Sequence, residues 1–298
     1  MSRRRVIVLL VVGVTAVSTS AVLVRLADAP GLAVAFYRCL FASLLLVPWA
    51  LLRHRGALAV LSRRERWLLV ASGLALAGHF ASWIPAIGLT SVAASVVLVQ
   101  TTPVWVVIIG PAFGERASRG AVAGIVVALA GTAIIVAGDL GGGTDVLLGD
   151  LLALVGALFA AIYILLGRRI RQRVPVVPYT ATVYSIAAGG LALLMLVAGT
   201  PFTGYSTRQW GLFLAMTLGP QLLGHTVFNL LLGQVSATVV SVALLAEPVG
   251  ATVLAAMFLD EAPGIQTVIG GLVVLAGVFL AIRAEARTAG EFATAPVE

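Results

Sequence analysis

The chain has 298 residues, of which 60% are hydrophobic and only 10% are charged, and its mean hydropathy is +1.09. A soluble domain carries about a quarter charged residues, so this composition excludes a water-soluble globular protein. The net charge of +7 comes from nineteen arginines and no lysine. All of these arginines except Arg38 stand in short segments at the ends of apolar runs, which argues against nucleic acid as a partner.

Ten apolar runs follow one another along the chain, each of about the 20 residues that a helix needs to cross a bilayer. They are predicted at 6–26, 31–52, 67–89, 92–113, 119–137, 147–166, 178–198, 208–230, 237–259 and 264–282. The first run resembles a secretory signal because basic residues precede it. It stays apolar through Val24, and we interpret it as a retained helix, with cleavage as the alternative.

The arginines orient these runs. With a cytoplasmic N-terminus, sixteen fall in inside segments and two, Arg25 and Arg208, in outside connectors. By the positive-inside rule this distribution predicts a multi-pass protein of the cytoplasmic membrane with both termini in the cytoplasm. The single cysteine, Cys39, lies in an apolar run, so no intrachain disulfide is predicted. Neither a cofactor nor a metal site is predicted.

The second and third runs carry polar residues at membrane depth. Arg38 lies about 10 Å below the outer end of its run, at 1.5 Å per residue. It either faces the interior pathway or snorkels outward. His79 and Trp83 occupy the third run, and Pro103 interrupts the fourth.

A shift of 146 residues aligns the two halves of the chain. Gly78–His79 falls on Gly224–His225 and Glu115 on Glu261, whereas Pro103 and Pro248 need a shift of 145. Each half holds five runs, an odd number, so the second half is predicted to be inverted. The predicted organisation is a first five-helix repeat, a linker, a second five-helix repeat and a polar cytoplasmic tail, at 1–138, 139–146, 147–283 and 284–298.

The eighth run carries Gln221, His225 and Asn229 at i, i+4 and i+8, on one face of a helix. Together with His79 and Trp83 of the equivalent run, they are predicted to line one central cavity. Hydrogen bonding between helices, without any substrate, is the alternative.

Glu247 and Pro248 stand inside the ninth run. A carboxylate near the centre of a membrane helix costs about 2.5–3.5 kcal/mol on insertion scales. Pro248 is expected to free the carbonyl of Leu244, which a wet cavity can satisfy. We therefore predict that Glu247 faces an interior pathway and not the lipid. A pair with Arg38, directly or through substrate, would offset part of both insertion costs.

Several segments resemble the EamA-type branch of the drug/metabolite transporter superfamily. They are "AVAFYRCLFASLLLVP", "LLAEPVGATVLAAMFLDE", "GAVAGIVVALAG" and "VIGGLVVLAG". The resemblance implies ten helices in two inverted five-helix repeats, alternating access, and charged intramembrane residues at Arg38 and Glu247. It implies nothing about the histidines, and "VLVQTTPVWVVIIGPAFGE" lacks the Glu before Pro.

The expected function is a secondary active transporter that exports amino acids or related small polar metabolites, with protons as a candidate coupling ion. A multidrug, organic-cation, sugar or nucleotide transporter of the same architecture is the alternative. An intramembrane enzyme or a channel is the alternative from another class. No enzyme is expected, because the sequence contains neither HExxH nor GxSxG.

Overall fold

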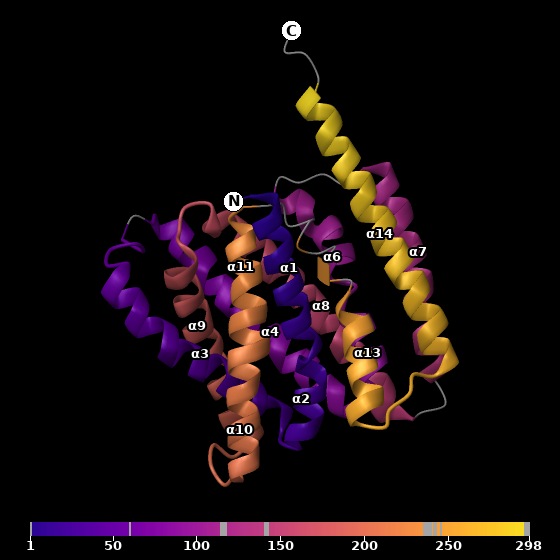
Figure 1. Cartoon of the computed structure of the whole chain (residues 1–298), viewed down its shortest axis with the longest axis horizontal. Helices are drawn as coiled ribbons and strands as arrows, with labels where there is room; N and C mark the ends of the chain where they lie inside the picture. Colours follow the sequence, from indigo (N-terminus) through magenta and orange to yellow (C-terminus); the bar gives the residue numbers. More distant parts are fainter. Residues whose placement is uncertain are drawn as a thin grey trace.

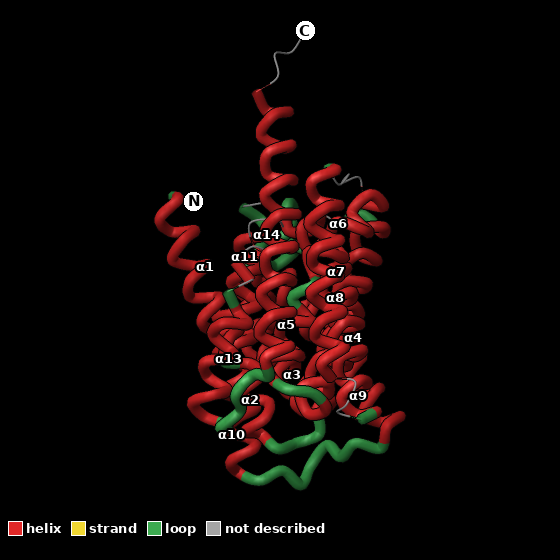
Figure 2. The backbone as a smooth tube through the Cα atoms, turned by 90° about the vertical axis from the view of Figure 1, so that its right-hand side faces the viewer, coloured by secondary structure: helices red, strands yellow, loops and turns green. Residues whose placement is uncertain are grey.

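A computed structural model describes residues 2–59, 61–113, 118–139, 143–234, 240, 243–244 and 246–294. Every regular element in these ranges is helical (Figure 2). Within the described ranges, seven helices are long and apolar enough to cross a membrane, and three shorter apolar helices are Val122–Ala137, Glu247–Phe258 and Ile265–Ala281. The predicted all-α membrane class is confirmed at this level.

The described residues of the first half form seven α-helices and one 3₁₀ turn. They are α1 (Arg3–Ser18), α2 (Ser20–Ala27), α3 (Gly31–Arg53), α4 (Arg63–Leu89), α5 (Val92–Val99), α6 (Thr102–Ile109), η1 (Gly110–Phe113) and α7 (Arg119–Asp139). Helix α4 begins four residues before the predicted boundary. The reason is a capping box, in which Ser62 and Glu65 each bond the other's backbone N–H.

The second half contains a π-helical segment in its third span. Its elements are α8 (Thr144–Arg171), α9 (Val176–Ala198), α10 (Thr207–Met216), the π-helix η2 (Thr217–His225), α11 (Thr226–Leu232), α13 (Glu247–Phe258) and α14 (Ile265–Thr294). Pro220 lies inside η2 and has no N–H for the α-helical hydrogen bond. The wider turn of η2 follows from this missing donor.

Four predicted features extend outside the described residues, and one of them is the ninth predicted run, of which 237–239, 241–242 and 245 lie there. Residues 140–142 of the predicted linker and 295–298 of the predicted tail lie there, as does Glu115 of the repeat alignment. The described part of the tail continues α14 as far as Thr294.

Helices of one half pack mainly against helices of the other half. Helix α8 lies against α4 and α5, and α1 lies against η2, α11 and α13. Equivalent helices also meet, since α3 packs on α9 and α7 on α14, whereas α5 packs on α13, the counterpart of α6. Figure 1 shows α7 and α14 side by side at one edge of the bundle.

The contact between α7 and α14 is made by glycines. A Cβ atom at Gly124 would lie 2.5 Å from the carbonyl oxygen of Gly277, and one at Gly131 would lie 2.6 Å from that of Gly270. The two backbones therefore touch, and the helices run antiparallel. Under the 146-residue shift, Gly270 is the counterpart of Gly124 and Gly277 is the counterpart of Gly131. Gly124 therefore contacts the counterpart of Gly131, and Gly131 contacts the counterpart of Gly124, so the contact is reciprocal.

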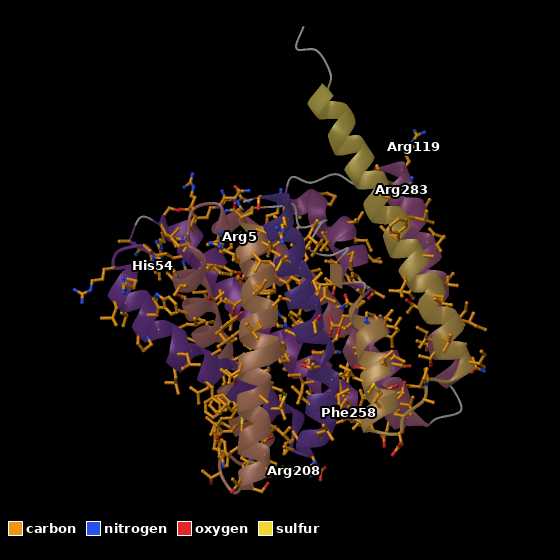
Figure 3. The ribbon with its side chains drawn as sticks, viewed as in Figure 1. Arg5, His54, Arg119, Arg208, Phe258 and Arg283 are labelled. Carbon is orange, nitrogen blue, oxygen red and sulfur yellow. The ribbon has the colours of Figure 1, made fainter. Side chains whose placement is uncertain are left out.

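The start of α1 and the end of α14 lie toward the same end of the bundle (Figures 1 and 2). Arg5, Arg119 and Arg283 are in the upper part of the bundle in Figure 3, whereas Arg208 and Phe258 are at the lower end. The three arginines assigned to inside segments thus lie toward one end, and Arg208, assigned to an outside connector, lies toward the other. Which end faces the cytoplasm stays a prediction.

Candidate functional site

Two helical spans are interrupted near the middle of the bundle. Helix α5 ends at Val99, with Gln100 as its C-cap, and α6 starts with Pro103 in its first turn. Helix α13 likewise starts at Glu247, with Pro248 in its first turn. Proline fits there because an N–H at a helix start has no intrahelical partner. Pro248 therefore begins a helix, where the sequence had suggested a bend within a continuous span.

Glu247 lies at the N-terminus of α13 and is 6% exposed. The partial positive charge of a helix N-terminus favours a carboxylate. Its Oε2 also accepts a hydrogen bond from Nε2 of Gln100 at 2.7 Å. The two interrupted spans thus meet at this bond. Gln100 is not among the residues predicted from the sequence, although it is an amide directly before the Thr101–Thr102–Pro103 break.

Arg38 is completely buried, which excludes the outward, snorkelling orientation. Its Nε donates to Oε1 of Gln221 at 2.8 Å and its Nη1 donates to Oγ of Ser20 at 3.2 Å. The guanidinium carbon lies 4.2 Å from the ring centre of Phe80, a cation–π contact. The ion pairs of the described residues do not include Arg38 with Glu247, so the predicted direct pair is absent in this conformation.

The two repeat-related histidines face each other. The ring centres of His79 and His225 are 6.2 Å apart, and His79 stacks on Trp83 at 5.7 Å with an interplanar angle of 13°. Nδ1 of His79 lies 2.9 Å from the carbonyl oxygen of Gly156. Asn229 donates through Nδ2 to the hydroxyl of Tyr163 and to the carbonyl of His225.

A cavity of about 70 Å³ lies among these groups. Its lining combines residues of both halves: Val17, Ser20, His79, Trp83, Val99, Gln100, Thr102, Ala160, Tyr163, Ile164, His225, Phe228, Asn229, Leu232, Val240, Leu244 and Glu247. The space is sufficient for several water molecules, since each needs roughly 10–15 Å³.

Four of the five residues predicted to share a cavity, His79, Trp83, His225 and Asn229, therefore line it, and Gln221 does not. The α-helical spacing used for Gln221 does not hold in the π-helix η2. Its side chain is directed to Arg38 instead.

Two of the lining residues carry a polar atom whose hydrogen-bonding capacity is unused in this conformation. Nε1 of Trp83 and Oδ1 of Asn229 are buried and have no hydrogen-bond partner among the described residues. One is a donor and the other an acceptor, and both belong to residues that share the lining with Glu247, Tyr163 and Phe228. A solute with donor, acceptor and apolar parts fits this lining. In the described chain no group of three His, Cys, Asp or Glu residues is placed to hold a metal ion.

Comparison with known proteins gives consistent matches along the chain. The model of the EamA-like transporter family matches residues 4–137 and 147–283. An "Uncharacterized transporter" of Archaeoglobus fulgidus is 30% identical over 254 residues, covering 83% of this chain and 86% of that protein. The "Uncharacterized transporter YxxF" of Bacillus subtilis is 25% identical over 258 residues, covering 85% and 81%.

A solved structure has a similar fold. It is titled "Crystal structure of protein", and it aligns with a TM-score of 0.68 at 21% sequence identity, covering 94% of this chain and 98% of that one. This likeness concerns the fold alone.

Proposed function

Because the chain belongs to the EamA-like transporter family, part of the drug/metabolite transporter superfamily, we propose that this membrane transporter is a secondary active carrier. It exports amino acids or related small polar metabolites by alternating access. No enzymatic activity is expected.

The central cavity is the observation that carries this proposal. Both halves contribute to it, and the interrupted spans place Gln100 and Glu247 at its wall. Interrupted helices at the interface of repeats are a usual construction of substrate sites in secondary transporters. An amino acid supplies an ammonium group for Glu247 and Oδ1 of Asn229, and a carboxylate for Nε1 of Trp83.

We further propose ten membrane-crossing helices arranged as two inverted repeats, at 1–138 and 147–283. The reciprocal contacts of α7 with α14 support this arrangement, because a two-fold axis makes each contact occur twice. The pairing of His79 with His225, at the same 146-residue offset, supports it independently. In our proposal both termini face the cytoplasm, on the arginine distribution.

Coupling to a proton gradient is part of the proposal. Glu247, His79 and His225 are titratable and lie at the cavity, and ionisable groups within membrane spans commonly serve proton relays. A nucleotide-binding motif is not found in the sequence.

Counterflow in proteoliposomes tests the proposal. Vesicles loaded with one unlabelled solute should accumulate the labelled form, with saturation and trans-stimulation, for members of an amino-acid panel. Matched panels of sugars, nucleotides and organic cations identify the alternative carriers. Vesicles with a Leu196→Ala variant, changed at a side chain that is 67% exposed on the bundle surface, serve as a control and should match the wild type. Flux that neither saturates nor shows trans-stimulation would indicate a channel.

A further inference from the structure

A cluster of contacts joins the two halves at the end of the bundle opposite the termini. Arg25 lies in the last turn of α2, and Glu261 lies between α13 and α14. Nη2 of Arg25 is 3.5 Å from Oε2 of Glu261 and donates to the carbonyl oxygen of Thr90 at 2.8 Å. Phe258, three residues before Glu261, marks this end in Figure 3.

Glu261 also caps a helix of the other half. Its Oε1 accepts a hydrogen bond of 2.6 Å from the backbone N–H of Val92, the first residue of α5. A carboxylate at this position satisfies a free N–H and meets the positive end of the helix. One carboxylate therefore connects the start of α5 to the α2 arginine and to the α13–α14 loop.

At the opposite end of the bundle, the arginine that corresponds to Arg25 in the second repeat makes different contacts. Arg25 and Arg171 are 146 residues apart, the offset of the repeat. Arg171 is buried and donates to the carbonyl oxygens of Asn229 and Val174. Among the described residues, the ion pairs do not include Arg171. Equivalent arginines thus hold the two ends by different bonds in this conformation.

We propose that Arg25 and Glu261 form the outer latch of the transport cycle. The latch is closed in this structure and must open for the cavity to reach the outer face. This inference rests on the proposed alternating access, because the latch joins the two halves whose relative movement would expose the cavity. Arg25 and Glu261 act on the conformational equilibrium and do not contact the solute, since neither lines the cavity.

Cysteine labelling tests the latch without a known solute. The reporter is Val99→Cys in a Cys39→Ala background, because Val99 lines the cavity and Cys39 is the single native cysteine. Intact cells receive a membrane-impermeant maleimide from outside. Arg25→Gln or Glu261→Gln should each raise the rate of reporter labelling about three- to tenfold, the effect of losing a partly exposed charged contact.

The opposite end supplies a matched control. Arg173→Gln removes the 2.8 Å ion pair between Arg173 and Glu65 and should not raise labelling from outside. Glu261→Gln keeps an oxygen for the N–H of Val92, so this variant is expected to reach the membrane at normal abundance. Unchanged labelling in both latch variants, at normal abundance, would overturn the latch.

Failure of the latch can be distinguished from failure of the proposed function. A wild-type protein that gives no counterflow with any panel solute contradicts the carrier function. The labelling experiment needs no transported solute, so its result supports or contradicts the latch whatever the counterflow assay gives.

Discussion

At the scale of the residue, Glu247 combines a buried carboxyl group with two stabilising features, the N-terminus of α13 and the amide of Gln100. Replacing it by glutamine keeps the size and an oxygen that can accept from Gln100, but it removes the charge. We expect Glu247→Gln to reach the membrane at wild-type abundance. Its counterflow rate should fall about ten- to hundredfold, because this is the factor that corresponds to losing a hydrogen bond to a charged group. Full transport with unchanged pH dependence would show that the carboxylate has no function.

Arg38 gives a second prediction, which follows from its actual partners. Arg38 bonds Gln221 and Ser20, and Glu247 bonds Gln100. The double variant Arg38→Gln with Glu247→Gln should therefore remain as inactive as the worse single variant in the counterflow assay. Restored activity would indicate that the two charges pair directly in another state of the cycle.

The residues that the sequence could identify were those whose chemistry conflicts with their surroundings. Arg38 and Glu247 were found because a charge in an apolar run is costly. Gln100 and Tyr163 were missed because an uncharged polar residue is common in such runs and carries no comparable signal. The partner of Arg38 also could not be predicted, since Gln221 was placed by α-helical spacing and the segment is a π-helix.

At the scale of the element, the apolar runs predicted most helix positions, and the interruptions had to come from the structure. Pro103 and Pro248 marked two breaks in advance, but proline alone does not distinguish a kink from a helix start. Pro220 is a third case, in which the chain widens into η2 instead of breaking.

The helix pair α7–α14 gives the prediction at this scale. A Cβ at Gly124 would lie 2.4 Å from the backbone nitrogen of Ala281, so a side chain there must push the two backbones apart. We expect Gly124→Val to lower the free energy of unfolding in detergent by about 1–3 kcal/mol, the usual cost of overpacking, and to lower the melting temperature with it. Gly189→Ala is the matched control, because a Cβ at Gly189 meets no atom within 4 Å. Equal melting temperatures for both variants would contradict the close contact.

At the scale of the whole molecule, the 146-residue offset was the informative signal. It related His79 to His225 before any contact between them was known, and the two rings lie 6.2 Å apart. The offset could not predict the conformation, because an inverted repeat is compatible with either end closed. The contacts of Arg25 and Arg171 distinguish the two ends only in three dimensions.

The orientation of the bundle in the membrane is the last prediction. Helix α8 spans 28 residues, so its ends are about 42 Å apart at 1.5 Å per residue, and they lie on opposite sides of a bilayer. Asp145 is exposed at its start, and Ala59 is exposed in the arginine-rich connector at the other end of the bundle. In the Cys39→Ala background, Asp145→Cys should react with an impermeant maleimide in intact cells, and Ala59→Cys only after permeabilisation. The positive-inside rule requires this result, because the connector at 53–66 contains five arginines. The reverse pattern of labelling would place both termini outside the cell and would turn the outer latch into an inner one.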